Sequence, residues 1–190
     1  MSNTDKKLAL GFLTVVEHPQ FGLFGGYLLL NQAGRPLQFH CTAPVKPNRA
    51  QEILYGPTLA SFVYGEQIGQ TLINQASVSP LLVCTDKEPA LAVREHVSTP
   101  VVLVLPAAAN VIGPPSTEEL TPVFRLDPPH HSPRLVTFEL GRNRLALPEQ
   151  AAEDRRLIAE RLSEVAESFD LAEPFQRIRD AIEEAQQAAR

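Results

Sequence analysis

Two basic side chains, Lys46 and Arg49, flank the expected start of a helix. Asn48 indicates this start, because its side chain can cap the first turn and Gln51, three positions later, completes a capping box. Free amide groups at a helix N-terminus attract anions. The sequence therefore predicts an anionic ligand or an acidic partner segment at the corner 44–52, with Lys46, Asn48 and Arg49 as the binding residues. An ordinary exposed cap is the alternative interpretation, because no glycine-rich phosphate loop accompanies it.

A second group of side chains could bind a metal or react as thiols: His40, Cys41, Cys84 and Asp86. Zinc accepts thiolate, imidazole and carboxylate ligands. However, no CxxC or HExxH spacing organises these residues, and strand alternation places His40 and Cys41 on opposite faces. We therefore expect two free, buried thiols and no metal site. The pair 130–131, two histidines in a proline-braced loop, is interpreted as exposed.

A third pattern concerns carboxylates at the ends of apolar segments. Glu17 follows the apolar run 8–16, and Asp86 follows the apolar run 80–84. A metal-dependent nuclease of ribonuclease H-like architecture needs carboxylates at strand ends to hold two Mg²⁺ ions. The run 8–16 itself contains no carboxylate, so this chemistry is only the alternative function, with Glu17 and Asp86 as its metal ligands. No serine elbow or nucleophilic cysteine context is present, and no catalytic residue is assigned.

The elements that must position these residues follow from apolar periodicity and from helix and turn signals. The expected order is strands at 8–16, 26–30 and 36–41, helices at 49–55 and 58–76, a strand at 80–84, a short helix at 89–97 and a strand at 99–105. The last two strands should be parallel, because a right-handed helical crossover joins them. The order βββαβαβ is shared by ribonuclease H-like domains, which is an analogy of element order only.

The remainder of the chain changes character twice. Proline is frequent at 106–133, as in an extended excursion. Short strands are expected at 123–127 and, as a pair, at 134–147, and we favour their joining the main sheet at an edge. The fold class is thus α/β, with a mixed sheet, extra edge strands and C-terminal helices. We expect a single α/β domain at 1–147 and a charged helical segment at 148–190, packed on it or extending from it.

The composition limits the classes of function. The chain has 190 residues, 44% of them hydrophobic and 21% charged, and a formal net charge of −5. This balance gives no general attraction to phosphate backbones or anionic membranes, so nucleic acid is expected to be an unlikely partner. Apolar runs are far shorter than the roughly 20 residues that cross a bilayer, and no signal-peptide pattern opens the sequence. We expect a cytoplasmic protein that does not bind a membrane.

The first interpretation is a non-enzymatic binding or assembly domain, because strands and helices are well specified while catalytic clusters are not. Its amphipathic C-terminal helices are expected to bind a protein partner or a second copy of the chain. No cofactor is expected. The alternative is a divalent-metal-dependent phosphoesterase or nuclease of ribonuclease H-like architecture.

Overall fold

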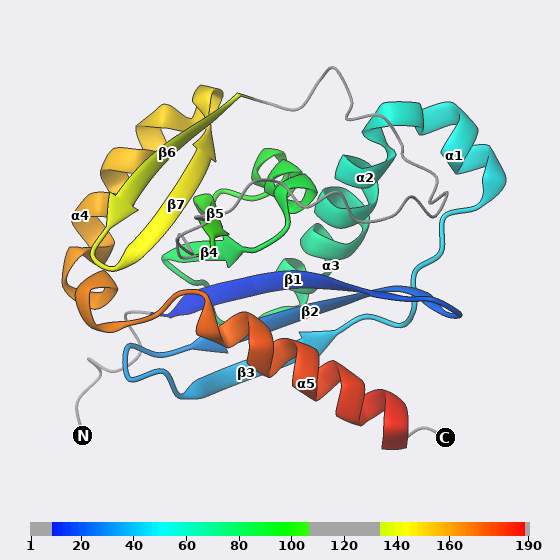
Figure 1. Ribbon diagram of the computed structural model, residues 1–190, viewed down its shortest axis with the longest axis horizontal. Coiled ribbons are helices and arrows are strands. Elements are labelled where there is room, and N and C mark those ends of the chain that lie inside the picture. Colours follow the sequence, from blue (N-terminus) through cyan, green and yellow to red (C-terminus); the bar gives the residue numbers. More distant parts are fainter. Residues whose placement is uncertain (1–8, 107–133, 189–190) are drawn as a thin grey trace, which may run out of the picture.

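The computed structural model describes residues 9–106 and 134–188, which form three layers with a mixed β-sheet between two layers of helices (Figure 1). The strands are β1 (Leu10–His18), β2 (Gly22–Leu30), β3 (Pro36–Cys41), β4 (Leu82–Thr85), β5 (Val101–Leu105), β6 (Leu135–Leu140) and β7 (Asn143–Pro148). Their order in the sheet is β3-β2-β1-β4-β5-β7-β6. Strands β1, β4 and β5 are parallel neighbours, and the other pairs are antiparallel.

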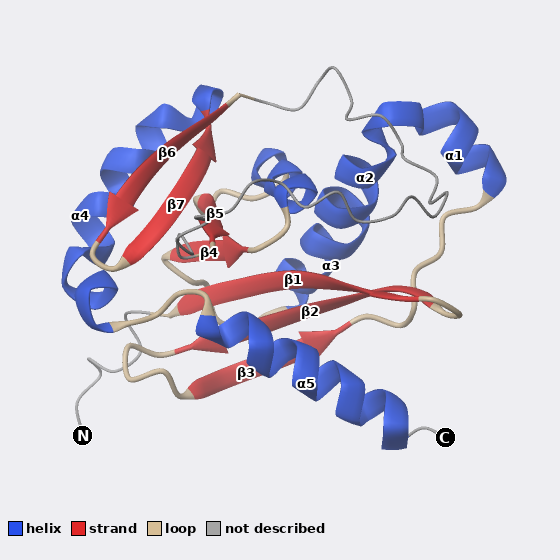
Figure 2. Ribbon diagram, in the orientation of Figure 1, coloured by secondary structure: helices blue, strands red, loops and turns tan. Residues whose placement is uncertain are grey.

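The helices divide between the two faces of the sheet (Figure 2). Before β4 the chain forms α1 (Arg49–Tyr55), η1 (Gly56–Thr58), α2 (Leu59–Ser61), η2 (Phe62–Gln70) and α3 (Thr71–Gln75). After β4 it forms η3 (Glu88–Glu95), η4 (Glu149–Ala151), α4 (Ala152–Ser168) and α5 (Glu173–Ala188). The segments η2, α3 and η3 cover one face, which we call the η2/η3 face, and α4 and α5 cover the other, the α4/α5 face.

Strand alternation divides the core between these faces. Phe12 and Cys84 are fully buried on the α4/α5 face, against Phe175 and Ile178 of α5. Leu13 is fully buried on the η2/η3 face. Both faces of the central strands are therefore apolar, as expected for strands covered on both sides.

Two adjacent glycines set how closely the helices approach the sheet. A side chain at Gly25 would overlap Cγ2 of Ile68 on η2, and one at Gly26 would overlap Cγ2 of Ile178 on α5. Successive residues of a strand point to opposite faces, so each glycine admits a different helix. The strand expected at 26–30 is longer in the structure, where β2 begins at Gly22. Its glycines do not mark a loop, because they lie within the strand at positions where helices pack closely on it.

The fold class predicted from sequence is confirmed: the structure is α/β, with a seven-stranded mixed sheet and C-terminal helices. β6 and β7 extend the main sheet through β5, as favoured. The strand expected at 123–127 lies outside the described residues. The division at residue 147 stays a prediction, although α4 packs on β6 and β7 and α5 packs on β1 and β2.

Over 9–106 and 134–188, none of the helices combines the length and the apolar character needed to cross a bilayer. A cytoplasmic location stays a prediction.

Candidate functional site: a paired strand-end carboxylate and an acidic groove

A partly buried polar cluster lies where β1 and β4 run side by side, and we call it the strand-end cluster: Thr14, Asp86 and Arg179. The Thr14 hydroxyl donates a hydrogen bond of 2.5 Å to Oδ1 of Asp86. The Arg179 guanidinium forms an ion pair with Oδ2 of the same carboxylate. Thr14 is fully buried, and the Asp86 side chain is 15% exposed. Both oxygens of Asp86 are therefore engaged inside the protein.

Sheet register brings the first two members together. β1 and β4 are parallel, with Leu13 opposite Thr85, so the next residue of each strand, Thr14 and Asp86, lies at the same level. Thr14 also pairs with Gly26 of β2, whose missing side chain lets α5 approach this face. The apolar strand thus places its one hydroxyl under α5.

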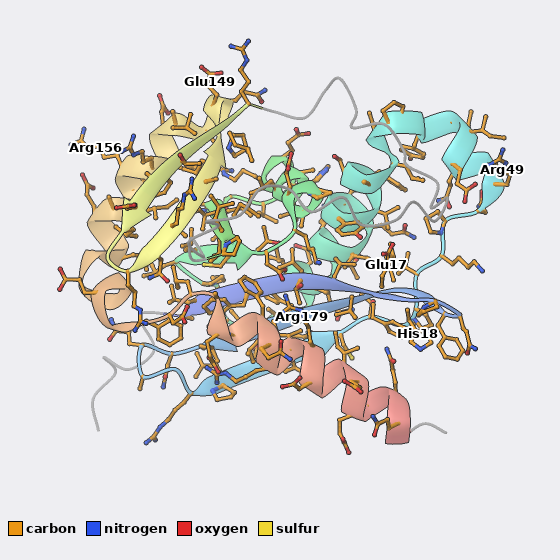
Figure 3. All side chains as sticks on the ribbon, in the orientation of Figure 1. Glu17, His18, Arg49, Glu149, Arg156 and Arg179 are labelled. Atoms are coloured by element: carbon orange, nitrogen blue, oxygen red, sulfur yellow. The ribbon has the colours of Figure 1, made fainter. Side chains whose placement is uncertain are left out.

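The third member depends on the placement of α5. Asn143, at the start of β7, accepts a hydrogen bond of 2.9 Å from the amide of Leu171, just before the helix. Arg177 donates a 3.0 Å hydrogen bond to the carbonyl of Gly34 in the β2–β3 turn. These contacts hold α5 across β1 and β2, and Arg179 points from it toward the sheet (Figure 3).

The strand-end cluster contains Asp86, one of the two metal ligands that the sequence predicts for the alternative function. A two-metal centre needs several carboxylates around the ions. Here Thr14 is the strand-one side chain, and the cation beside Asp86 is the guanidinium of Arg179. Within residues 9–106 and 134–188, no group of three or more His, Cys, Asp or Glu side chains could hold a metal ion.

Glu17 lies on the other face of the sheet from Asp86. It pairs with Leu23 across β1 and β2, and Leu23 belongs to the core of the η2/η3 face. Burial raises the pKa of Tyr64 on η2, and the negative charge of Glu17 adds to this rise. The structure therefore does not bring Glu17 and Asp86 together, and the two carboxylates cannot share one ion.

The predicted helix cap at the corner 44–52 is confirmed in its local geometry. The Asn48 side chain accepts from the amide of Gln51 at 2.9 Å, and Gln51 accepts from the amide of Asn48 at 3.0 Å. Arg49 forms an exposed 3.0 Å ion pair with Glu52 on the same helix, while Lys46 is exposed. Ligand binding by Lys46, Asn48 and Arg49 stays a prediction.

The thiol and imidazole candidates His40, Cys41 and Cys84 are dispersed. Cys41 pairs with Gly26 and His40 with Tyr27, so the two side chains face opposite sides of the sheet, as expected. Cys84 is buried, and burial raises the pKa of its thiol. The expectation that Cys41 is also buried is wrong: β3 is an edge strand and Cys41 is exposed. The histidines at 130–131 lie outside the described residues.

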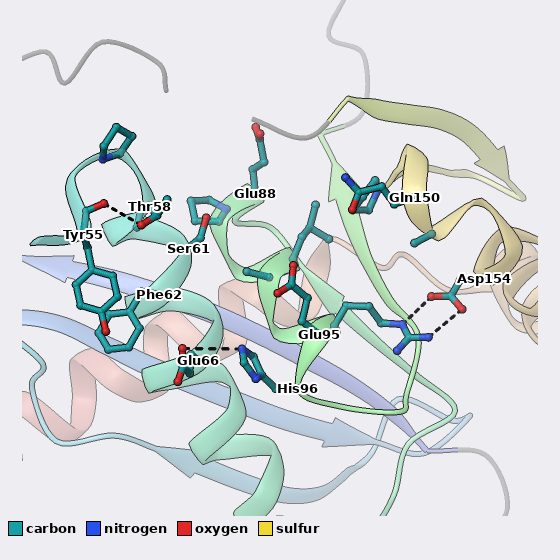
Figure 4. Close-up of a pocket in the computed structure, with 18 of the residues that line it drawn as sticks. Tyr55, Thr58, Ser61, Phe62, Glu66, Glu88, Glu95, His96, Gln150 and Asp154 are labelled. Carbon is teal, nitrogen blue, oxygen red and sulfur yellow. Dashed lines mark hydrogen bonds and ion pairs between the residues drawn. The ribbon is translucent and has the colours of Figure 1, made fainter. Parts of the chain in front are cut away.

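A groove of about 860 Å³ opens on the side of the molecule where η3 lies between the η1–η2 region and the start of α4 (Figure 4). Its lining includes an aromatic pair, Tyr55 and Phe62, stacked with ring centroids 4.1 Å apart. It also includes five carboxylates: Glu66, Glu88, Glu95, Glu153 and Asp154. We call this feature the acidic groove.

One carboxylate of the acidic groove is already neutralised. Arg94, the only Lys or Arg among the groove's described lining residues, donates to Asp154 from Nε at 2.7 Å and from a terminal nitrogen at 3.3 Å. The hydrogen bond to Asp154 raises the pKa of Arg94. Glu66 lies 4.0 Å from Nε2 of His96.

Sequence reasoning named Asp86 but missed its partners Thr14 and Arg179, and it missed the acidic groove. Thr14 carried a signal, because it is a lone polar residue in an apolar strand, and Arg179 stands beside a buried isoleucine position on α5. The sequence around Thr14 or Arg179 does not predict that either residue contacts Asp86. The acids of the groove are scattered from residue 66 to residue 154, and each by itself resembles an ordinary solvated side chain.

The similarity of this chain to known proteins is restricted to solved structures that match about half of its length. No protein-family model and no curated protein matches the chain. Similar solved structures include a variant of endonuclease V from Ciona intestinalis in complex with a 23mer DNA containing an inosine followed by a ribo-adenosine, with TM-score 0.33 and 10% identity over 50% of this chain and 44% of that one. Human ENDOV gives TM-score 0.28 and 10% identity over 51% and 44%. The chain thus matches less than half the length of either, and similarity this weak does not indicate a shared activity.

The partner prediction is corrected on two points. The apolar stripes of the C-terminal helices, Ile158 and Leu162 of α4 and Phe175, Ile178 and Ile182 of α5, are buried in the core and present no docking face. The exclusion of nucleic acid rested on net charge, and it is withdrawn because endonuclease V, found by the structural comparison, is seen in complex with DNA.

Proposed function

We propose that this chain is a non-enzymatic binding domain in which Asp86 has a structural role. The observation that supports this is the occupation of both Asp86 oxygens, one by the Thr14 hydroxyl and one by the Arg179 guanidinium. A metal ion could use Asp86 only if Arg179 moved away. The displaced guanidinium would then lie beside a dication of the same sign, which is unfavourable in a partly buried site.

The position of Asp86 favours a second candidate, the divalent-metal-dependent phosphoesterase or nuclease. Asp86 follows directly after β4, a central parallel strand, beside β1. Ligands of open α/β sheets commonly bind outside the carboxyl ends of such strands. This candidate lacks a second carboxylate at Thr14, and it requires that Arg179 release Asp86.

One experiment separates the two candidates. The native chain and Asp86→Asn are incubated with Mg²⁺ or Mn²⁺ and with single-stranded and duplex DNA and RNA, including an inosine-containing duplex. We expect no cleavage above that of Asp86→Asn, and no metal-dependent shift in the melting temperature of the native chain. Mn²⁺-dependent cleavage by the native chain that is lost in a folded Asp86→Asn variant would overturn the proposal. Thermal melting of each variant verifies that it is folded.

A further inference from the structure

The acidic groove combines negative charge with apolar surface. After Asp154 is paired with Arg94, four carboxylates remain, and within the described residues Glu88, Glu95 and Glu153 have no ion-pair partner. All three are exposed. Like charges gathered without counterions repel one another, so a cationic ligand that entered the groove would relieve this repulsion.

Part of the groove lining is apolar. The lining includes Leu91 and Ala92 of η3, and the stacked rings of Tyr55 and Phe62 stand on the opposite side from α4 (Figure 4). Tyr55 is 36% exposed. An aromatic ring near carboxylates is a favourable environment for a lysine or arginine side chain, which gains a cation–π contact as well as charge neutralisation.

Exposed aliphatic side chains also occur on α1, whose last residue, Tyr55, lines the groove. None of the α1 residues is buried, and Ile53 and Leu54 are 66% and 82% exposed, next to Tyr55 at the groove's end. Exposed aliphatic side chains that adjoin a groove favour a ligand with apolar groups of its own. A small polyamine carries positive charge but has no side chains to cover this surface.

From these features we propose that the acidic groove binds a basic peptide segment of a partner protein, in which lysine or arginine side chains alternate with apolar ones. This inference names the partner for the proposed binding function and rests on it. The docking surface is formed by η3, the η1–η2 region and the first turn of α4, and it does not involve the buried apolar stripes of α4 and α5.

Fluorescence anisotropy with a short labelled peptide of lysine, arginine and leucine tests the proposal. A peptide in which glutamate replaces the basic residues is the control ligand, and spermine is the competitor. The groove variant is the triple substitution Glu88→Gln, Glu95→Gln and Glu153→Gln. A matched control removes three exposed acids elsewhere: Glu139→Gln, Glu167→Gln and Glu184→Gln. The two variants have the same net charge and differ only in where the acids were removed.

We expect the groove variant to bind the basic peptide at least about tenfold more weakly than the native chain, and the control variant to bind within about twofold of it. Tyr55→Ala should also weaken binding, and affinity should fall with rising salt. Equal losses in the groove and control variants, or no measurable binding of the basic peptide, would overturn the proposal. Spermine binding as tight as that of the peptide would assign the groove to small polycations instead.

The outcome is independent of the nuclease question. A failure to bind basic peptides removes this partner while leaving the metal and cleavage measurements unchanged. Metal-dependent cleavage removes the non-enzymatic proposal while leaving peptide binding to be judged by the two triple variants.

Discussion

The strand-end cluster and the acidic groove use carboxylates in opposite ways. In the strand-end cluster a single carboxylate, Asp86, is nearly buried and is engaged by Thr14 and Arg179. In the acidic groove several carboxylates are exposed, and Glu88, Glu95 and Glu153 lack ion-pair partners among the described residues. A charge that stabilises a fold is paired inside it, whereas charges held together on the surface without partners cost stability and are available to a ligand.

The largest effect expected from a single substitution is the loss of the Asp86 carboxylate. Asp86→Ala leaves Arg179 without its counterion and the buried Thr14 hydroxyl without its acceptor, so the free energy of unfolding should fall by about 2 kcal/mol. This value is at the low end for a buried pair because the Arg179 side chain is 37% exposed and stays partly hydrated. Urea denaturation measures it. Asp180→Ala, an exposed acid on α5, is the control, and an equal loss in both variants would contradict a special role for Asp86.

A second test converts the strand-end cluster toward a metal centre. Thr14→Asp combined with Arg179→Ala places a second carboxylate beside Asp86 and removes the competing cation. We expect this variant to be less stable than the native chain without metal, and Mn²⁺ at 100 times its dissociation constant to stabilise it by about 2.7 kcal/mol. Arg179→Ala alone is the control for the added carboxylate. A metal-dependent shift in the native chain would instead show that Arg179 does not block Asp86.

Alkaline titration measures how well the interior on the two faces of the sheet is closed to water, because Cys84 is buried on the α4/α5 face and Tyr27 on the η2/η3 face. Burial raises the pKa of Cys84 and of Tyr27, so in the folded state both groups keep their protons at pH values where the unfolded chain loses them. Their contribution to stability is complete below the unfolded pKa values, about 8.5 for a thiol and 10 for a phenol, and is lost as the pH rises above them. Stability should fall by about 1.4 kcal/mol per pH unit for each group. Cys84→Ala should reduce this slope, whereas Cys41→Ser should leave it unchanged, and equal slopes in both variants would contradict the argument.

The smallest expected effect is in the groove. The triple variant Glu88→Gln, Glu95→Gln and Glu153→Gln should change the free energy of unfolding by less than about 0.5 kcal/mol, because these exposed acids make no ion pair in the described structure. Asp154→Asn should cost more, since it removes the partner of Arg94. Chemical denaturation of both variants makes the comparison. A loss above about 1 kcal/mol in the triple variant would mean that the acids have a structural role.

Local features were predictable from the sequence because their causes are local. The capping box at Asn48 and Gln51 needs only residues three positions apart, and the parallel pair β4 and β5 follows from the short crossover between them. The strand-end cluster was not predictable in this way. Arg179 and Asp86 are 93 positions apart, and their contact depends on how α5 lies across the sheet.

The exposure of Cys41 has a similar cause. Its segment, PLQFHC, alternates apolar and polar residues, as in a strand with one covered face. However, it forms the outermost strand, and α5 packs on β1 and β2 instead. Leu37 and Phe39, which share its face, are exposed as well. The pattern of apolar residues identifies a strand. Whether a helix buries the face of that strand depends here on α5, which lies more than a hundred residues later in the chain.

The two adjacent glycines of β2 have a consequence for how this sequence can diverge. Each is kept small by a different layer: Gly25 by Ile68 of η2, and Gly26 by Ile178 and Ile182 of α5. A larger residue at position 25 should therefore be tolerated in descendants of this chain only with a smaller one at 68, and a larger residue at 26 only with smaller ones at 178 or 182. Position 25 would then covary with position 68 of η2, and position 26 with positions 178 and 182 of α5. Substitutions on one face of the sheet would therefore be independent of those on the other.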